Sequence, residues 1–229
     1  IIAFLVIIMF VAVFIKLMQP KAETTEKKVA MAYYSAFTNN KWGIIDSSGN
    51  TVITPSYDEM VVVPNKDKAV FIVTYDVDYT NGTYKTKAVN EKNEQLFSTY
   101  DQVEAIQNYD QQNNIWYEKS CLRVKKDNKY GIIDSRGNVK IYIEYDEIGI
   151  DNTKFEKNDI KNKYLIANGL IPVRKDKTWA LFDKNGNQLT DFEYDSFGYI
   201  ASSNKDAINL LVIPDYDVIV ACKNKKYTL

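Results

Sequence analysis

Histidine is absent from all 229 residues of this chain. Without an imidazole, the chain has no Ser–His–Asp or Cys–His catalysis, no His-based pH switch and no catalytic zinc site of the usual kind. Carboxylates, Lys, Tyr and Cys are the side chains left for chemistry. An excess of basic residues is also absent, since 29 Lys and Arg stand against 30 Asp and Glu. We therefore expect no nucleic-acid partner.

Cysteine is scarce, with only Cys121 and Cys222. They stand nine and five residues before Tyr130 and Tyr227, at different positions of the repeats described below. Because repeat symmetry does not bring the two thiols together, we expect no disulfide between them. The lack of a disulfide framework does not exclude a location outside the cytoplasm, because a chain of this length can bury a core that needs no cross-links.

Charge is almost absent from residues 1–18, where Lys16 is the one charged side chain. As a helix this run would be about 27 Å long, close to the ~30 Å hydrocarbon core of a bilayer. We expect residues 1–19 to form a transmembrane helix in contact with membrane lipid, followed by a charged linker over residues 20–29 that begins at Pro20. A pilin-like start is a weaker alternative, because position 5 is Leu5 and not the expected Glu.

An internal repeat organises the rest of the chain. Lys129–Asn138 reads Lys-Tyr-Gly-Ile-Ile-Asp-Ser-Arg-Gly-Asn, and Tyr145-Asp146 follows it. The pattern also occurs from Lys41 and, with more changes, from Thr178. In these three copies the leading aromatic residue and the closing Tyr are fifteen positions apart. The repeat signature comprises Trp42, Gly43, Asp46, Gly49, Tyr57, Asp58, Tyr130, Gly131, Asp134, Gly137, Tyr145, Asp146, Trp179, Asp183, Gly186, Tyr194 and Asp195.

A degenerate copy over residues 88–101 ends at Tyr100-Asp101 and carries Asn93 where the other copies have Gly. Asn tolerates the left-handed backbone conformation that a turn of this kind requires. The four Tyr-Asp pairs are 43, 45 and 49 residues apart. This spacing predicts a continuous array over residues 30–229, with units near 30–60, 61–103, 104–148 and 149–197 and a partial unit over 198–229.

Each copy has the chemistry of a β-hairpin. Tyr130 and Ile132 should point to one face of a strand and Ile133 to the other, so apolar residues on both faces indicate a strand covered on both sides. Asp134 can accept backbone N–H groups of the following turn, and Gly137 can adopt positive φ. We expect further strands at Val61–Val63, 69–73, 121–124 and 170–173, with a turn at Asn81-Gly82. The predicted fold is an all-β repeat array, propeller-like or solenoid.

The Lys-aromatic-Gly-Ile-Ile-Asp-x-x-Gly-Asn pattern, followed at a fixed offset by Tyr-Asp, resembles the bacterial WG-repeat proteins. The Trp-Gly pair of their name is kept at Trp42-Gly43, and becomes Tyr130-Gly131 and Trp179-Ala180 in the later copies. The resemblance covers roughly residues 30–229. It implies an all-β array, common in surface-linked proteins, and it carries over no catalytic residue.

Two sharper interpretations of the signature are disfavoured. Asp46, Asp134 and Asp183 precede a Gly as calcium ligands do, but Arg136 lies within one of these loops and would repel a cation. Carboxylate pairs such as Asp58/Glu59, Asp146/Glu147 and Asp101/Glu104 recur with the repeat, whereas a catalytic pair occurs once. We expect the Tyr-Asp residues to connect adjacent units through backbone hydrogen bonds, and we expect no catalytic residue, metal or cofactor.

Function is more readily sought where the copies differ. Aromatic residues fill two inserts, a Tyr-rich run over residues 75–84 and a second group at Tyr109, Trp116 and Tyr117. Such loops are frequent binding surfaces, although packing along the edge of the array is an equal alternative. The leading hypothesis is a non-enzymatic, single-pass membrane protein of a bacterial envelope, whose extracytoplasmic array binds a protein partner. A glycan- or wall-binding module is the alternative, and a carboxylate-dependent hydrolase is a weaker one.

Overall fold

A computed structural model of the chain describes residues 32–109, 115–149, 169–200, 209–210, 212–213 and 218–228. These residues belong to the unit Met31–Leu229, one of two into which the chain divides. Their regular secondary structure is β-strand throughout, as the repeat predicted. Within these ranges no helix is long and apolar enough to cross a membrane. The transmembrane helix expected over residues 1–19 and the linker over residues 20–29 lie outside the described residues.

The strands are short and follow one another closely along the chain. Their bounds are β1 Tyr33–Thr38, β2 Lys41–Asp46, β3 Thr51–Tyr57, β4 Phe71–Asp78, β5 Thr83–Val89, β6 Gln95–Leu96, β7 Gln102–Tyr109, β8 Ile115–Lys126, β9 Lys129–Asp134, β10 Val139–Tyr145, β11 Glu147–Ile148, β12 Leu170–Lys175, β13 Thr178–Asp183, β14 Ser196–Phe197, β15 Tyr199–Ile200, β16 Asn209–Leu210, β17 Val212–Ile213, β18 Val218–Ile219, β19 Ala221–Lys223 and β20 Lys226–Thr228.

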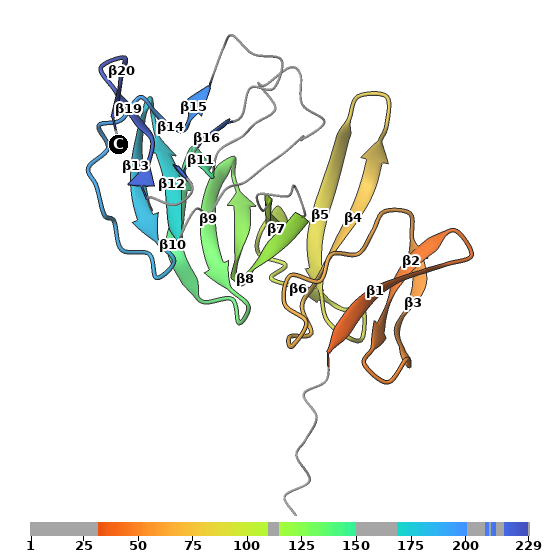
Figure 1. Cartoon of the computed structure of the whole chain (residues 1–229). Helices are drawn as coiled ribbons and strands as arrows, with labels where there is room; N and C mark the ends of the chain where they lie inside the picture. Colours follow the sequence, from red (N-terminus) through yellow and green to blue (C-terminus); the bar gives the residue numbers. More distant parts are fainter. Residues whose placement is uncertain are drawn as a thin grey trace, which may run out of the picture. The chain divides into compact units, whose positions relative to one another are not determined.

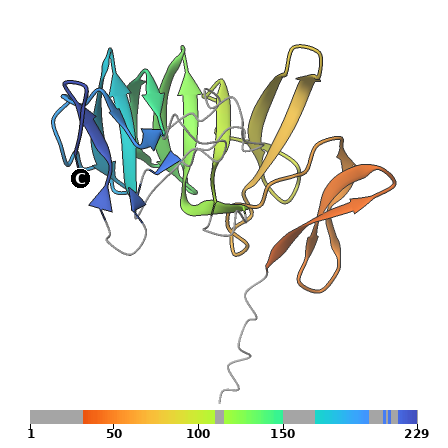
Figure 2. The same ribbon diagram turned by 45° about the horizontal axis from the view of Figure 1, so that its top comes forward.

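Each repeat unit is a small antiparallel meander. The sheets are β1-β2-β3, β4-β5-β6, β7-β8-β9-β10, β11-β12-β13 and β14-β19-β20. In the first four, neighbouring strands are also neighbours in sequence, whereas in the fifth β14 pairs with β19. The pairs β15-β16 and β17-β18 form two smaller sheets. Figures 1 and 2 show the larger sheets side by side in chain order. Each of these sheets has only three or four short strands, and stacking on the next sheet buries its apolar faces.

The core is a row of apolar clusters, each between two successive sheets. One cluster joins Ile44 and Ile53 to Phe71 of β4, and the next joins Ile72 and Ala88 to β7, β8 and β9. A third lies between β7–β10 and β11–β13, and a fourth joins Leu181 of β13 to Phe197 and Ala221. The alternating pattern of each strand therefore supplies two neighbouring clusters.

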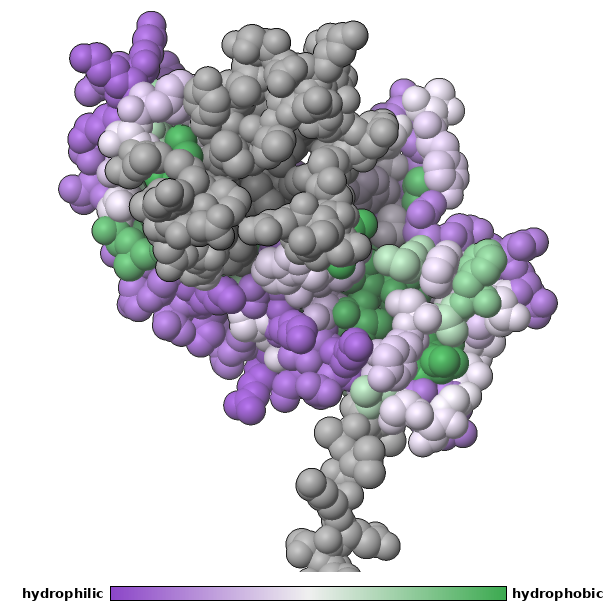
Figure 3. Space-filling view, viewed as in Figure 1, coloured by the Kyte–Doolittle hydropathy of each residue, from purple (hydrophilic) through white to green (hydrophobic). Residues whose placement is uncertain are grey.

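Strand β9 confirms the prediction for its two faces. Ile132 and Tyr130 pack into the cluster shared with β12 and β13, whereas Ile133 packs into the cluster shared with β4 and β5. Both isoleucines are fully buried. The first sheet has a neighbouring sheet on one face only within the described residues, and Phe37 of β1 stays 55% exposed. Figure 3 shows hydrophobic surface gathered over β1–β3 and the segment that leads to β4.

The fifteen-residue spacing is the register of a hairpin. Trp42 pairs with Tyr57 across β2 and β3, and Tyr130 pairs with Tyr145 across β9 and β10. In both hairpins the second strand, β3 or β10, contains extra residues, which form a bulge opposite the signature glycine. A Cβ on Gly131 would lie 2.8 Å from the Ile141 carbonyl oxygen, and one on Gly43 would overlap the Ile53 carbonyl oxygen.

Ala180 stands at this glycine position in the third copy, and the structure shows why it fits. Trp179 still bridges to Tyr194, and Phe182 bridges to Gln188, but no continuous third strand runs between those two bridges. The backbone opposite Ala180 is therefore free of the tight bulge that excludes a methyl group at Gly43 and Gly131. Ala180 is fully buried in the third cluster.

Two predicted strands differ from the structure. Val61–Val63 is not a strand: only Val62 forms a bridge, to Ile72, and Val61 is buried as a core residue below the first sheet. Its apolar residues fill space between two sheets instead of extending a ladder. The strand expected over residues 69–73 begins later, at Phe71, and continues to Asp78 as β4. The predictions at 121–124 and 170–173 are confirmed as parts of β8 and β12.

The cysteines are both free and buried. Burial raises the pKa of the Cys121 thiol to about 12, so this side chain is a small core residue and not a nucleophile at neutral pH.

Candidate functional site

The signature Asp residues cap their own turns. Asp134 accepts the backbone N–H groups of Arg136 and Asn138 at 2.8 and 2.9 Å, and its second oxygen accepts the Asn138 side-chain amide at 2.9 Å. Asp46 with Asn50 and Asp183 with Asn187 repeat this arrangement. The capping role was predicted, but the partner role of the final Asn was not, although its recurrence four residues after each Asp was a visible signal.

The degenerate copy keeps the same turn-capping hydrogen bonds, but the amide and the carboxylate exchange positions. Asn90 takes the Asp position and accepts the backbone N–H groups of Lys92 and Glu94 at 2.9 Å. Its side-chain amide donates to the Glu94 carboxylate at 2.8 Å. Asn93 has φ of +62°, which confirms that it replaces the turn glycine. Repetition of one hydrogen-bond pattern in four turns identifies these residues as structural.

These caps predict that the fold weakens in acid. The side-chain amides of Asn50 and Asn187 lower the pKa of Asp46 and Asp183, and in Asp134 burial opposes the same hydrogen bonds without overcoming them. A carboxyl group with a lowered folded pKa contributes stability above its unfolded pKa of about 4 and loses it as the pH falls through the folded value. We expect the urea midpoint to be constant from pH 7 to pH 5 and to fall below pH 4.

Single Asp46→Asn and Asp183→Asn variants test this assignment in urea titrations at pH 7 and pH 3. Each should be less stable than the parent at pH 7 and should lose less stability on acidification. Asp191→Asn is the matched control, because Asp191 is exposed and outside these turns. An acid slope that is unchanged in the Asp46 and Asp183 variants would contradict the assignment.

The Tyr-Asp carboxylates connect one unit to the next, as predicted. Asp101, Asp146 and Asp195 accept the backbone N–H groups of Asp127, Asp176 and Lys225 at 2.8, 2.6 and 2.8 Å. Each donor lies in the two-residue hairpin turn of the following unit. Lys129 of the signature also pairs with Asp146 at 2.6 Å, and Lys41 pairs with Asp58 in the same way.

Asp58 is the exception, because the next hairpin is longer than the others. Four hairpins turn through two residues, as between the paired residues Lys126 and Lys129 of β8 and β9. In β4 and β5 the equivalent pair is Tyr75 and Lys85, and residues 76–84 lie between them. The insert continues the two strands and ends in the turn that Gly82 forms with φ of +64°. The turn at Asn81-Gly82 was predicted.

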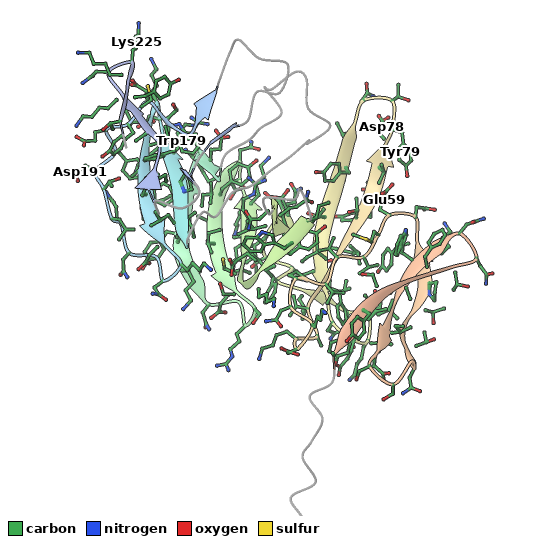
Figure 4. All side chains as sticks on the ribbon, in the orientation of Figure 1. Glu59, Asp78, Tyr79, Trp179, Asp191 and Lys225 are labelled. Carbon is green, nitrogen blue, oxygen red and sulfur yellow. The ribbon has the colours of Figure 1, made fainter. Side chains whose placement is uncertain are left out.

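A pocket of about 430 Å³ lies beside this extended hairpin. The insert contributes Val77, Asp78, Tyr79 and Tyr84, and other walls come from β7, β8 and the segment after β3. Figure 4 shows Glu59, Asp78 and Tyr79 along the β4–β5 hairpin. A β-bulge lies between Tyr75 and Asp78, where Asp76 has φ of +51°. Bulges commonly redirect side chains next to functional sites, and here Thr74 and Val77 both line the pocket.

Hydrogen bonds fix the acidic side chains of the pocket. The Tyr79 hydroxyl donates to Glu59 at 2.6 Å, and this bond raises the pKa of Tyr79. Asp78 accepts the Asn81 side-chain amide at 2.6 Å and the Thr80 backbone N–H at 2.9 Å, and these bonds lower the pKa of Asp78. Two carboxylates are thus held in place around the hairpin end.

A buried ion pair supports the opposite wall. Arg123 of β8 donates through Nε to Glu104 of β7 at 2.6 Å, and its second contact to that carboxylate is 2.5 Å. The same guanidinium donates to the Ile148 carbonyl oxygen at 3.1 Å and lies 4.6 Å from the centre of the Tyr130 ring. Arg123 is 4% exposed, so its guanidinium interacts with these protein groups and is shielded from solvent.

The family model described as WG containing repeat matches residues 42–71 and 130–152. The matches support a WG-repeat β protein. Both begin at the signature aromatic residue and include the Tyr-Asp pair, so they cover two of the hairpins whose register is given above. No curated protein and no solved structure matches the chain.

The aromatic residues nominated for binding divide between two faces. Tyr117 lines the pocket, on the same face as its cross-strand partner Gln107. Trp116 is the neighbouring residue on β8, on the other face, and is 42% exposed. Tyr109 ends β7 and pairs with Ile115, and its side chain lies outside what the structure describes. One of the three therefore belongs to the pocket between the second and third repeat units.

Other residues that line the pocket were not predicted from the sequence as binding residues. Glu59 and Glu104 were weighed only as catalytic carboxylates, and Thr86 had no signal in the sequence. The Tyr-rich insert over residues 75–84 was recognised, and Tyr79 and Tyr84 of that run do line the pocket. Among the described residues no group of three acidic, Cys or His side chains is placed to hold a metal ion.

Proposed function

We propose that this chain is a non-enzymatic binding module, in which the WG repeats form the scaffold and the pocket beside the β4–β5 hairpin binds a segment of a protein partner. The observation that carries the proposal is the coincidence of the pocket with the insert over residues 76–84. A rigid repeat array with a binding site at an irregular unit is a common arrangement.

The composition of the pocket supports binding rather than catalysis. A glycosidase needs one carboxylic acid with a raised pKa as its proton donor. Asp78 has a lowered pKa, and Glu104 is engaged by the buried Arg123. The remaining surface combines tyrosines with an apolar floor at Val62 and Ile72, a mixture typical of recognition sites.

The apolar run at residues 1–18 supports a membrane location for the module. We propose that it is a single membrane anchor and that the repeats lie on the extracytoplasmic side, as an accessory subunit of a bacterial envelope assembly. This part of the proposal rests on the length of the run and its single charge, Lys16. Protease treatment of intact cells and of lysed cells should cut the array in both cases; protection in intact cells would contradict the orientation.

Partner binding is tested by purification from membranes in mild detergent. We expect a stoichiometric partner with the parent chain and with Tyr142→Ala, and loss of most of it with the double variant Tyr79→Ala/Tyr84→Ala. Tyr142 is the matched control, since it is 73% exposed, Tyr79 is 74% exposed, and Tyr142 does not line the pocket. Equal recovery with the double variant would rule out the pocket as the partner site.

A glycan is the second candidate ligand, because Tyr79, Tyr84 and Tyr117 all line one pocket and aromatic faces stack on sugar rings. Binding to purified cell-wall material separates the two candidates. Retention of the parent chain on the wall material, with loss in Tyr117→Ala but not in Trp116→Ala, would favour the glycan; no retention of the parent would dismiss it.

A further inference from the structure

We propose that the pocket beside the β4–β5 hairpin accepts a positively charged side chain, Lys or Arg, presented by the protein partner. This inference rests on the proposed binding function and names the chemistry of the group recognised. It is carried by three features of the pocket: its charge balance, a buried hydroxyl group without a partner, and the apolar and aromatic surface between them.

The first feature is an unbalanced negative charge. Three carboxylates line the pocket, and no Lys or Arg does so among the described residues. Arg123 offsets the charge of Glu104, since the pair is in direct contact and nearly buried. Glu59 and Asp78 accept hydrogen bonds from neutral groups only, and neither belongs to any salt bridge found in the described ranges. Their two charges are therefore left for a ligand.

The second feature is Thr86, which lines the pocket from β5. The residue is 7% exposed, and its Oγ1 is buried without a hydrogen-bond partner. A buried hydroxyl group without a partner is unfavourable, and a bound ligand can supply the missing hydrogen bond. A hydroxyl oxygen can accept from an ammonium or guanidinium N–H, which makes Thr86 a further acceptor in the pocket that Glu59 and Asp78 also line.

The third feature is the surface between these acceptors. Val62, Ile72 and Ala105 line the pocket together with Tyr84 and Tyr117. Lys and Arg bury their aliphatic stems along apolar surface, and their charged ends are attracted to aromatic faces. A single long basic side chain therefore matches both the floor of the pocket and the charges beside the hairpin.

The protein's own basic residues on the hairpin are directed away. Lys85 and Lys87 alternate with Tyr84 and Thr86 along β5, so they point to the other face of the strand. There both lie over the Tyr75 ring, at 5.9 and 5.0 Å from its centre, and Lys85 pairs with Asp76 at 2.9 Å. The pocket face of the hairpin keeps its negative charge because its lysines are held on the opposite face.

NMR titration of the full chain in detergent tests the inference with two small probes. N-acetyl-arginine amide carries the charge, and N-acetyl-citrulline amide is nearly the same shape without it. We expect the arginine probe to shift the amide signals of Gly82, Tyr84 and Thr86, with an apparent affinity at least about tenfold above that of citrulline, as for a charge-assisted hydrogen bond. Methyl glycosides serve as the third probe.

Variants locate the effect. Glu59→Gln and Thr86→Val should each weaken binding of the arginine probe several-fold, whereas Lys85→Gln, on the other face, should leave it unchanged. Equal binding of arginine and citrulline, or shifts caused only by the glycosides, would overturn the cationic ligand. Absence of shifts with every probe would overturn it as well. The copurification test with Tyr79→Ala/Tyr84→Ala judges the proposed function separately.

Discussion

Replacement of Gly186 by Ala should lower the free energy of unfolding by about 4 kcal/mol, the largest loss we expect from any single methyl group in this chain. Two effects add. Gly186 has φ of +93°, where a non-glycine residue costs roughly 1–2 kcal/mol. A Cβ there would also overlap the carbonyl oxygen of Lys140 in the preceding unit, which is backbone and cannot rotate away.

The repeat supplies its own controls for this prediction. Gly49 and Gly137 occupy the same turn position, with φ of +83° and +88°. A Cβ on Gly49 would meet nothing within 4 Å, and one on Gly137 would lie 2.9 Å from the Phe97 ring. Gly49→Ala should therefore cost only the backbone effect of roughly 1–2 kcal/mol, and Gly137→Ala an intermediate amount because the ring can shift.

Urea titration followed by Trp fluorescence measures the series, and hydrogen exchange locates the loss. Because repeat arrays can open one unit at a time, Gly186→Ala should remove protection first from β12 and from β13, which contains Trp179. Equal losses at Gly49, Gly137 and Gly186 would show that φ alone matters and that the close approach between units does not.

The graded environment of these three glycines illustrates what a sequence can predict in a repeat. Positive φ at Gly49, Gly137 and Gly186 followed from the turn chemistry, and the fifteen-residue spacing proved to be the Trp42–Tyr57 register. Both depend on contacts within one hairpin. The contact of Gly186 with Lys140 joins two units, and no local pattern encodes how closely two units approach.

The same distinction applies to the candidate site. The Tyr-rich insert was visible as a departure from the repeat, and it forms the hairpin extension over residues 76–84. Which of its residues face the pocket depends on the bulge at Asp76, and the other walls come from β7 and β8. Thr86 is one of many threonines in strands, and its role arises only from the missing partner of its hydroxyl group.

The ion pair between Arg123 and Glu104 is another contact that could not be predicted from the sequence. Its loss should have the second large effect on the stability of the fold. Replacement of Arg123 by Met should destabilise the fold by about 3–5 kcal/mol, because it leaves a nearly buried carboxylate without its counter-charge. The Ile148 carbonyl oxygen and the face of Tyr130 would lose the same guanidinium. Met keeps much of the aliphatic volume of Arg, so the variant removes charge and hydrogen bonds more than packing.

A double-mutant cycle separates the ion pair from the remaining contacts of Arg123. Glu104→Gln alone leaves the guanidinium with the Ile148 carbonyl oxygen and should cost less than Arg123→Met. If the uncompensated carboxylate causes the loss, Arg123→Met combined with Glu104→Gln should recover a kilocalorie or more relative to Arg123→Met alone, a coupling of about 1–3 kcal/mol. Additive losses would instead assign the effect of Arg123 to its contacts with Ile148 and Tyr130.

Glu104 lines the pocket, so recovery of stability in the double variant also provides a folded chain in which the charge of that wall has been removed. Binding of the arginine probe to that chain should be nearly unchanged, because Arg123 already offsets Glu104 in the parent and Glu59 and Asp78 carry the charge that the ligand meets.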